Sequence, residues 1–273
     1  MTRLTISCIQ TNIGPVLTDN LTTIEGLIRK AKAQGAEMVV LPENADCMVH
    51  DRAKKRAQSF PEDDNPSVNL YRKLANELSV WIICGSIAVP AVEDKCANRC
   101  LVFRPDGSIA GRYDKIHLYD AVPKPGEVYR ESELFVPGDK AVLVETPWGK
   151  LGLSICYDVR FPHLYRALAK AGAVMLSVPA AFTETSGKAH WHTLLRARAI
   201  ETGCFVFAAA QTGTHDGGRR TFGHSLIIAP WCEIIADGGE AVGVITATID
   251  LDKVTEARNA IASLQHDRTF TLE

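Results

Sequence analysis

Residues 151–162, with the sequence LGLSICYDVRFP, contain the change of pattern that decides the fold. The first five residues form an apolar run typical of a buried strand, and Pro162 suits the first turn of a helix. Cys156 lies between them, so we expect its side chain at the edge of a sheet, near free backbone N–H groups that favour an anion. A strand that leads directly into a helix predicts an α/β fold.

The same alternation of strand and helix patterns runs along the rest of the chain. The expected strands are residues 4–10, 38–41, 81–89, 98–103, 108–114, 141–145, 150–155, 174–178, 204–209, 225–229 and 243–250. The expected helices are residues 20–34, 67–78 with Ser67 as its cap, 162–171, 189–202 and 251–264. Residues 119–140, rich in proline and glycine, are expected to be irregular. No linker or repeat interrupts the pattern, so we expect one domain, residues 1–273, with two packed sheets and helices outside.

The composition restricts the classes of protein and partner. Of the 273 residues, 46% are hydrophobic and 23% are charged, and the net charge is −2. A chain of this kind can bury a large core, which excludes a disordered tail or a coiled coil. It has no basic run and no apolar stretch of about 18 to 20 residues, so we expect neither a nucleic-acid nor a membrane partner. The N-terminus lacks a signal-peptide pattern and the eight cysteines are scattered, which predicts free thiols and a cytoplasmic location.

Two charged residues follow apolar strands at positions where local structure requires no charge. Glu43 follows residues 39–42 (VVLP), and Lys115 follows the expected strand 108–114. A thiol with a pKa near 8.5 is only a few per cent thiolate at neutral pH, so Cys156 needs a base or a positive field to act as a nucleophile. Each of these residues alone is typical of a strand end. Together, each just past a strand, they indicate one reaction centre.

Three motifs in this order resemble those of the nitrilase, or carbon–nitrogen hydrolase, superfamily. They are residues 41–43 (LPE), 114–118 (DKIHL) and 155–162 (ICYDVRFP). The resemblance covers nearly the whole chain and implies an αββα four-layer sandwich of two mixed β-sheets with helices outside. It also implies a catalytic Glu43–Lys115–Cys156 triad, no metal, no cofactor, and a homodimer or a higher homo-oligomer. A second glutamate is expected after the lysine, and Glu131 fits that place better than Glu127.

The residue types define the chemistry that such a triad is expected to perform. Glu43 takes the proton of the Cys156 thiol, and the thiolate attacks the carbon of an amide. The ammonium of Lys115 and the backbone N–H of Tyr157 stabilise the oxyanion, and one preorganised donor of this kind is typically worth about 10²–10³ in rate. Glu43 then protonates the leaving nitrogen and deprotonates the water that hydrolyses the thioester. Glu131 is expected to orient Lys115 or the substrate.

Within the superfamily, the sequence is most similar to the deaminated glutathione amidase branch. The stretches that carry this similarity are residues 156–162 (CYDVRFP), 189–191 (AHW), 195–202 (LRARAIET), 208–211 (AAAQ), 223–225 (GHS) and 230–231 (PW). That branch cleaves an α-keto-acid amide, the transaminated form of glutathione. The resemblance therefore implies a small amide as substrate. An ω-amidase acting on 2-oxoglutaramate, a nitrilase and an N-carbamoyl amino acid hydrolase are the alternatives.

An acidic substrate needs cationic or N–H partners. Arg160, near the nucleophile, is a candidate carboxylate ligand because guanidinium binds carboxylates bidentately, and an ion pair with Asp158 is the alternative. Tyr157 and Phe182 are candidate substrate-binding residues, with core packing as the alternative for Phe182. Residues 217–220 (GGRR) are expected to form an exposed loop.

Two other classes of protein are alternatives to a thiol amidase. A binding protein with a silent site would be expected to lack one of the three triad residues, and all three are present. A metal hydrolase would need clustered ligands, but His190 and His192 on a helix diverge by about 200°. Activity that survives chelation would exclude the metal hydrolase.

The assignment of Cys156 as nucleophile predicts the behaviour of one variant. Cys156→Ser is expected to abolish amide turnover, because a hydroxyl is a far weaker nucleophile beside the same base. Turnover is measured by product release, and circular dichroism checks that the variant is folded. Unchanged activity in a folded variant would exclude the assignment.

Overall fold

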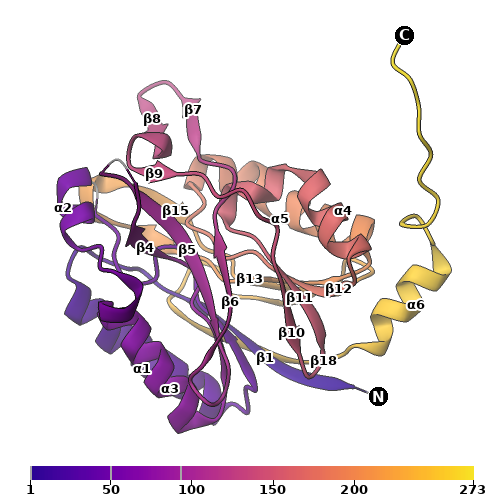
Figure 1. Cartoon of the computed structure of the whole chain (residues 1–273), viewed down its shortest axis with the longest axis horizontal. Helices are drawn as coiled ribbons and strands as arrows, with labels where there is room; N and C mark the ends of the chain where they lie inside the picture. Colours follow the sequence, from indigo (N-terminus) through magenta and orange to yellow (C-terminus); the bar gives the residue numbers. More distant parts are fainter. Residues whose placement is uncertain (1, 50, 93) are drawn as a thin grey trace.

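The computed structural model describes residues 2–49, 51–92 and 94–273. Its two largest sheets pack face to face, and helices lie on the outer side of each (Figure 1). The architecture is an αββα sandwich of two mixed sheets, as the sequence predicts.

The first sheet joins strands from the two ends of the chain. Its order is β18-β1-β2-β3-β5-β4, and β6 and β9 also pair with β5. The strands are β1 (Arg3–Gln10), β2 (Met38–Val40), β3 (Trp81–Ile83), β4 (Ile87–Pro90), β5 (Cys96–Phe103), β6 (Ile109–Asp114), β9 (Phe135–Val136) and β18 (Gly243–Asp250). Helices α1 (Leu17–Ala33) and α3 (Pro66–Leu78) cover its outer face, and the short α2 (Arg52–Ala57) contacts β4.

The second sheet has the order β10-β11-β12-β13-β16-β17. Its strands are β10 (Leu143–Thr146), β11 (Gly149–Leu153), β12 (Ala173–Ser177), β13 (Phe205–Ala208), β16 (Leu226–Ile228) and β17 (Ile234–Asp237). Helices α4 (Pro162–Lys170) and α5 (Glu184–Thr202) pack on its outer face, and α6 (Asp252–Ala260) follows β18. Because β11, β12 and β13 are parallel, the segments that follow them emerge at one edge of the sheet.

Strand β2 shows how the sandwich uses its apolar residues. Met38 and Val40 belong to the core between the two sheets, whereas Val39 and Leu41 belong to the core between the first sheet and its helices. Because both faces are buried, the strand is apolar at every position instead of alternating.

The expected strand 81–89 is wrong in one respect, because the structure divides it into β3 and β4. Gly85 lies at the break with a φ of +68°, in the left-handed region that favours glycine. A Cβ atom at this position would lie 2.0 Å from the carbonyl oxygen of Pro42. Gly85 therefore permits a close approach to the segment that precedes Glu43.

The segment 119–140 is also more regular than expected. It contains the hairpin of β7 (Asp120–Lys124) and β8 (Glu127–Arg130), followed by β9. The prolines did not prevent pairing because the hairpin is a separate two-stranded sheet, where each strand has a free edge. A second small sheet is formed by β14 (Thr212–Thr214) and β15 (Arg220–Phe222).

Three helix starts differ from the expectation. Helix α1 begins at Leu17 instead of residue 20. The cap of α3 is Asn65, whose side chain accepts from the N–H groups of Ser67 and Val68, while the Ser67 hydroxyl caps nothing. Helix α5 begins at Glu184 instead of residue 189, after an extended Thr183 whose hydroxyl pairs with that of Ser186 at 2.7 Å. The residues of the first turn of α5 are mostly polar, so the apolar pattern of the sequence did not reveal that turn.

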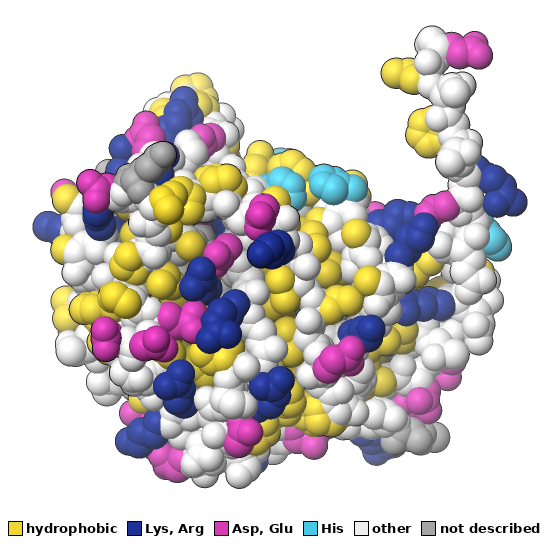
Figure 2. Space-filling model, in the orientation of Figure 1, with side chains coloured by type: hydrophobic (Ala, Val, Ile, Leu, Met, Phe, Trp, Pro, Cys, Tyr) yellow, Lys and Arg dark blue, Asp and Glu magenta, His cyan; other side chains and the backbone are white. Residues whose placement is uncertain are grey.

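The surface carries no single-sign field on the face shown in Figure 2, where basic and acidic side chains are interspersed. After α6 the chain extends away from the sandwich, and Phe270 and Leu272 near its end are almost fully exposed (Figure 1). No helix within the described ranges is long and apolar enough to span a membrane.

The close approach at Gly85 predicts a large loss of stability in Gly85→Ala. The new methyl would overlap the carbonyl oxygens of Pro42 and Leu41, so the free energy of unfolding should fall by about 3 kcal/mol or more, measured by urea denaturation. Gly126→Ala is the matched control, because its φ is +84° but no atom lies within 4 Å of the added Cβ. It should lose only about 1–2 kcal/mol. Equal losses would show that backbone conformation alone explains the need for glycine.

Candidate active site

Glu43 follows β2 at the edge of the first sheet and is 3% exposed. Its backbone oxygen accepts from Gln211 Nε2 at 3.0 Å. The side-chain oxygens have different partners: Oε1 accepts from Lys115 Nζ at 2.8 Å, and Oε2 accepts from the N–H of Ala181 at 2.9 Å. Since Ala181 lies beyond β12, this carboxylate joins the edges of the two sheets.

Lys115 directly follows β6 and is 2% exposed. Its backbone is fixed on both sides, because its N–H donates to Asn98 O at 2.9 Å and its carbonyl oxygen accepts from Gly138 N at 2.8 Å. The ammonium donates to Glu43 and, at 2.9 Å, to both oxygens of Glu131. One cation is thus enclosed by two carboxylates.

Of the two glutamates considered from the sequence, Glu131 contacts the lysine. Its Oε1 also accepts from Asn98 Nδ2 at 3.1 Å, and its Oε2 accepts from the N–H of Tyr119 at 2.5 Å. Glu127 instead accepts from the hydroxyl of Tyr129 at 3.1 Å. Asn98 is a component that the sequence analysis missed: its Nδ2 reaches Glu43 as well, at 3.0 Å, and joins the two carboxylates.

Cys156 lies after β11, at the start of the 3₁₀ turn η3 (Cys156–Arg160) that precedes α4. Its φ is +49°, which is unfavourable for a residue with a side chain and persists only where the surroundings fix the backbone. Here the Cys156 N–H donates to Pro179 O at 2.8 Å. Cys156 is 7% exposed, and its thiol lies close enough to Glu43 for that carboxylate to raise its pKa. The sequence placed this residue correctly at a strand-to-helix corner.

Asp158 ties the cysteine corner to the lysine segment, and the sequence analysis missed this role. Its carboxylate is fully buried and accepts from the N–H of Ile155 at 2.8 Å and the hydroxyl of Tyr113 at 2.6 Å. It also contacts the His117 ring at 2.7 Å and accepts from the His117 N–H at 3.1 Å. Tyr113 and His117 flank Lys115, so one carboxylate sets the position of both segments.

The charges in this cluster control one another. Burial alone would raise the pKa of the Glu43 carboxyl. The charge and hydrogen bond of Lys115 outweigh this effect and lower the pKa to about 2. Burial lowers the pKa of the Lys115 ammonium, yet the carboxylates of Glu131 and Glu43 raise it well above its usual value. Burial, together with the Glu43 charge, raises the pKa of the Cys156 thiol. Near neutral pH the cluster therefore holds a carboxylate, an ammonium and a neutral thiol.

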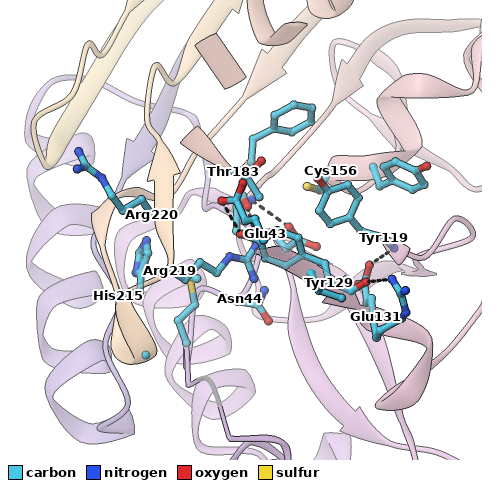
Figure 3. Close-up of a pocket in the computed structure, with 18 of the residues that line it drawn as sticks. Glu43, Asn44, Tyr119, Tyr129, Glu131, Cys156, Thr183, His215, Arg219 and Arg220 are labelled. Atoms are coloured by element: carbon cyan, nitrogen blue, oxygen red, sulfur yellow. Dashed lines mark hydrogen bonds between the residues drawn. The ribbon is translucent and has the colours of Figure 1, made fainter. Parts of the chain in front are cut away.

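A cavity of about 490 Å³ opens onto this cluster (Figure 3). Its wall combines the two sheet edges with the β7–β8 hairpin and the loop that joins β14 to β15. Glu43, Lys115, Glu131 and Cys156 all line it. The arrangement places a thiol, two carboxylates and a buried cation at one cavity.

The predicted substrate-binding residues divide into two groups. Tyr157 and Phe182 line the cavity. Arg160 is absent from its lining; the guanidinium lies 5.2 Å from the Phe182 ring centroid and its Nη2 is 3.3 Å from His190 Nδ1. The alternative, an ion pair of Arg160 with Asp158, is wrong, because that carboxylate is occupied by Tyr113, His117 and Ile155 as described above.

The expectation that residues 217–220 are exposed is confirmed for Gly217, Gly218 and Arg220 and is wrong for Arg219. All four residues line the cavity, and Arg219 is half-buried while Arg220 is exposed. The glycines predict a loop, but no sequence pattern indicates which part of the structure that loop faces. His190 and His192 do point to different partners, since His192 Nε2 lies 3.1 Å from Asp237 Oδ2.

Comparison with known proteins gives consistent results. The model of the carbon–nitrogen hydrolase family matches residues 5–259. The chain is similar to a deaminated glutathione amidase of Synechocystis, with 42% identity over 265 residues that cover 95% of this chain and 96% of that protein. It is also similar to the omega-amidase NIT2 of Xenopus tropicalis, with 37% identity over 96% of this chain and 94% of that one. The crystal structure of the NitFhit protein of C. elegans superposes with a TM-score of 0.90 at 37% identity, over 97% of this chain and 65% of that longer chain.

The lowered pKa of Glu43 predicts how stability depends on pH. The folded-state pKa lies below the unfolded value, so this carboxylate stabilises the fold above about pH 4.5, and the contribution is lost as the pH falls toward 2. Between pH 7 and pH 3, urea denaturation should show the wild-type protein losing about 2 kcal/mol more than Glu43→Gln. Glu145→Gln, which removes an exposed carboxyl, should follow the wild type. Parallel curves for the wild type and Glu43→Gln would contradict the lowered pKa.

Proposed function

This chain belongs to the carbon–nitrogen hydrolase family, and on that premise we propose that it is a cofactor-free thiol amidase that hydrolyses a small α-keto-acid amide of the deaminated glutathione type. It is a hydrolase that acts on amides. The observation that supports the thiol mechanism is the buried ion cluster itself, in which Lys115 Nζ lies 2.8 Å from a Glu43 oxygen beside Cys156. Apolar residues of similar size would stabilise this part of the fold better than a buried carboxylate and ammonium do. The presence of these charges around a thiol, in a cavity, therefore supports a catalytic role.

The first step is attack by sulfur on the amide carbon. In the resting site the Cys156 thiol keeps its proton, because burial raises its pKa and that of Glu43 is low. The proton therefore passes to Glu43 as the S–C bond forms and the carbonyl electron pair moves to oxygen. The Lys115 ammonium, with the N–H of Tyr157, stabilises that oxyanion and makes the transfer favourable.

The second step expels the nitrogen. The oxyanion collapses to a thioester, the C–N bond breaks, and Glu43 returns its proton to the leaving nitrogen, which departs as ammonia or an amine. Water then attacks the thioester carbon while Glu43 takes one of its protons. The C–S bond breaks, Cys156 recovers its proton, and a carboxylic acid is released. Glu131 holds Lys115 in place through both steps and keeps it charged.

The substrate class is proposed from the relatives and the cavity together. The Synechocystis relative is named a deaminated glutathione amidase and the Xenopus relative an omega-amidase. Both names denote enzymes acting on amides of keto acids, and a cavity of about 490 Å³ suits such small molecules. An ω-amidase acting on 2-oxoglutaramate is therefore the second candidate function.

The remaining proposals concern the whole molecule. We propose that residues 1–273 form one domain that works in the cytoplasm as a homodimer or a larger homo-oligomer. The eight cysteines are all free thiols, which suits a reducing compartment. Ile200 and Trp231 border a groove beside α5 and are more than half exposed, which suits a contact with a second copy.

The substrate is tested by comparing two amides. Deaminated glutathione should release cysteinylglycine with a kcat/KM at least about tenfold above that for ammonia release from 2-oxoglutaramate, measured by mass spectrometry and by a coupled ammonia assay. The reverse order would support the ω-amidase. Cys156→Ser gives the background rate for both amides, and the absence of turnover above that rate would exclude both functions.

A further inference from the structure

The charges of the proposed active site create a problem for an acidic substrate. Glu43 and Glu131 carry two negative charges against the single positive charge of Lys115, and the Cys156 thiol is neutral. A substrate carboxylate that enters the cavity therefore approaches a net negative cluster. Inside a partly dry site such repulsion is strong, so a further cation must lie nearby.

Most cations that line the cavity are already paired with an acid of the protein. Arg52 pairs with Glu133, Lys55 lies 3.8 Å from Asp46 Oδ1, and Arg220 Nε lies 2.8 Å from Glu184 Oε2. Lys124 and Arg130, on the β7–β8 hairpin, are exposed, so water screens their charges.

Arg219 differs from these cations because its partners in the described part of the chain are neutral. Its Nη2 donates to the carbonyl oxygen of Ala181 at 2.7 Å, and its guanidinium lies 5.3 Å from the centroid of the Tyr129 ring. The Nε is buried and has no acceptor among the described residues. A half-buried guanidinium that makes no ion-pair contact with a described carboxylate is a ready partner for the carboxylate of a ligand.

The loop that carries Arg219 is rigidly anchored. The Arg219 carbonyl oxygen accepts from the N–H of His215 at 2.8 Å. The buried His215 ring is in turn held between Ile13 O at 2.9 Å and Thr221 Oγ1 at 2.7 Å. A cation fixed in this way loses little conformational entropy when a ligand binds.

One residue, Ala181, connects Arg219 to the proposed reacting centre through its two backbone polar groups. The N–H of Ala181 donates to Glu43 Oε2, and the carbonyl oxygen of the same residue accepts from Arg219. Figure 3 shows Arg219 beside Glu43, whereas the Arg220 side chain extends away from it. The charge of Arg219 also contributes to the low pKa of Glu43, which agrees with this proximity.

We propose that Arg219 is the carboxylate-binding residue of the substrate site, and that it selects amides that carry a carboxylate a few bonds from the scissile carbonyl. This inference rests on the proposed amidase function and replaces Arg160, predicted from the sequence, in that role. The guanidinium of Arg219 faces the Tyr129 ring, which holds it in place. The free N–H groups of the guanidinium then bind the carboxylate.

The test uses a pair of amides that differ only in charge. In 4-oxopentanamide the carboxylate of 2-oxoglutaramate is replaced by a methyl group. Arg219→Gln should lower kcat/KM for 2-oxoglutaramate by about 100-fold, mainly through KM, and that for 4-oxopentanamide by less than about fivefold. Arg219→Lys should be intermediate, because an ammonium lacks the bidentate fork. Arg72→Gln, the control at an exposed arginine on α3 that does not line the cavity, should change neither value by more than about threefold.

Binding without turnover separates this inference from the proposed function. Calorimetry with 2-oxoglutarate, the acid formed from 2-oxoglutaramate, should show binding to the wild type and at least tenfold weaker binding to Arg219→Gln. If no amide is hydrolysed but this difference is found, the amidase proposal fails and the carboxylate site remains.

Two results would overturn the inference. Equal losses on the charged and the neutral amide would mean that Arg219 only supports Ala181. A selective loss in Arg160→Gln, with Arg219→Gln unaffected, would return the role to Arg160.

Discussion

The buried contact of the Lys115 ammonium with two carboxylates is the constraint on which the rest of the site depends. Removing three charges from water costs several kcal/mol for each ion, and only close contacts and further hydrogen bonds offset that cost. The structure supplies them from several parts of the chain: Asn98 reaches both carboxylates, Ala181 donates to one and Tyr119 to the other. The sheet edges must therefore meet with little freedom, since any separation would leave a charge buried and unpaired.

That requirement explains features that lie outside the cluster. Gly85 lets the β3–β4 break approach the segment before Glu43, and Asp158 fixes the segments of Cys156 and Lys115 to each other. The positive φ of Cys156 is maintained by the same surroundings. The backbone positions thus determine where the three side chains meet, and the proposed reaction needs no large rearrangement to bring them together.

The sequence could predict those parts of the fold that short-range pattern controls. Strands buried on both faces were visible as apolar runs, and the strand-to-helix corner at Cys156 followed from an apolar run and a proline. The break at Gly85 was missed because its cause is a contact with Pro42, more than forty positions earlier. The β7–β8 hairpin was missed because proline is tolerated in a two-stranded sheet. Of the site, the residues at strand ends could be proposed, and the structure brings Glu43, Lys115, Glu131 and Cys156 into contact. Asn98 and Arg219 were missed because their contacts are with residues more than thirty positions away in the sequence.

The protonated resting state of the Cys156 thiol has a consequence for the chemical stability of the protein. Peroxides and most electrophiles attack thiolates, so a cysteine that keeps its proton at rest is poorly reactive toward them and is slow to enter the series of sulfenic, sulfinic and sulfonic acids. In the proposed mechanism, its reactivity appears only when a carbonyl group lies where the lysine can stabilise the developing negative charge. The same desolvation that makes the proposed nucleophile weak in isolation would therefore protect it from damage between turnovers.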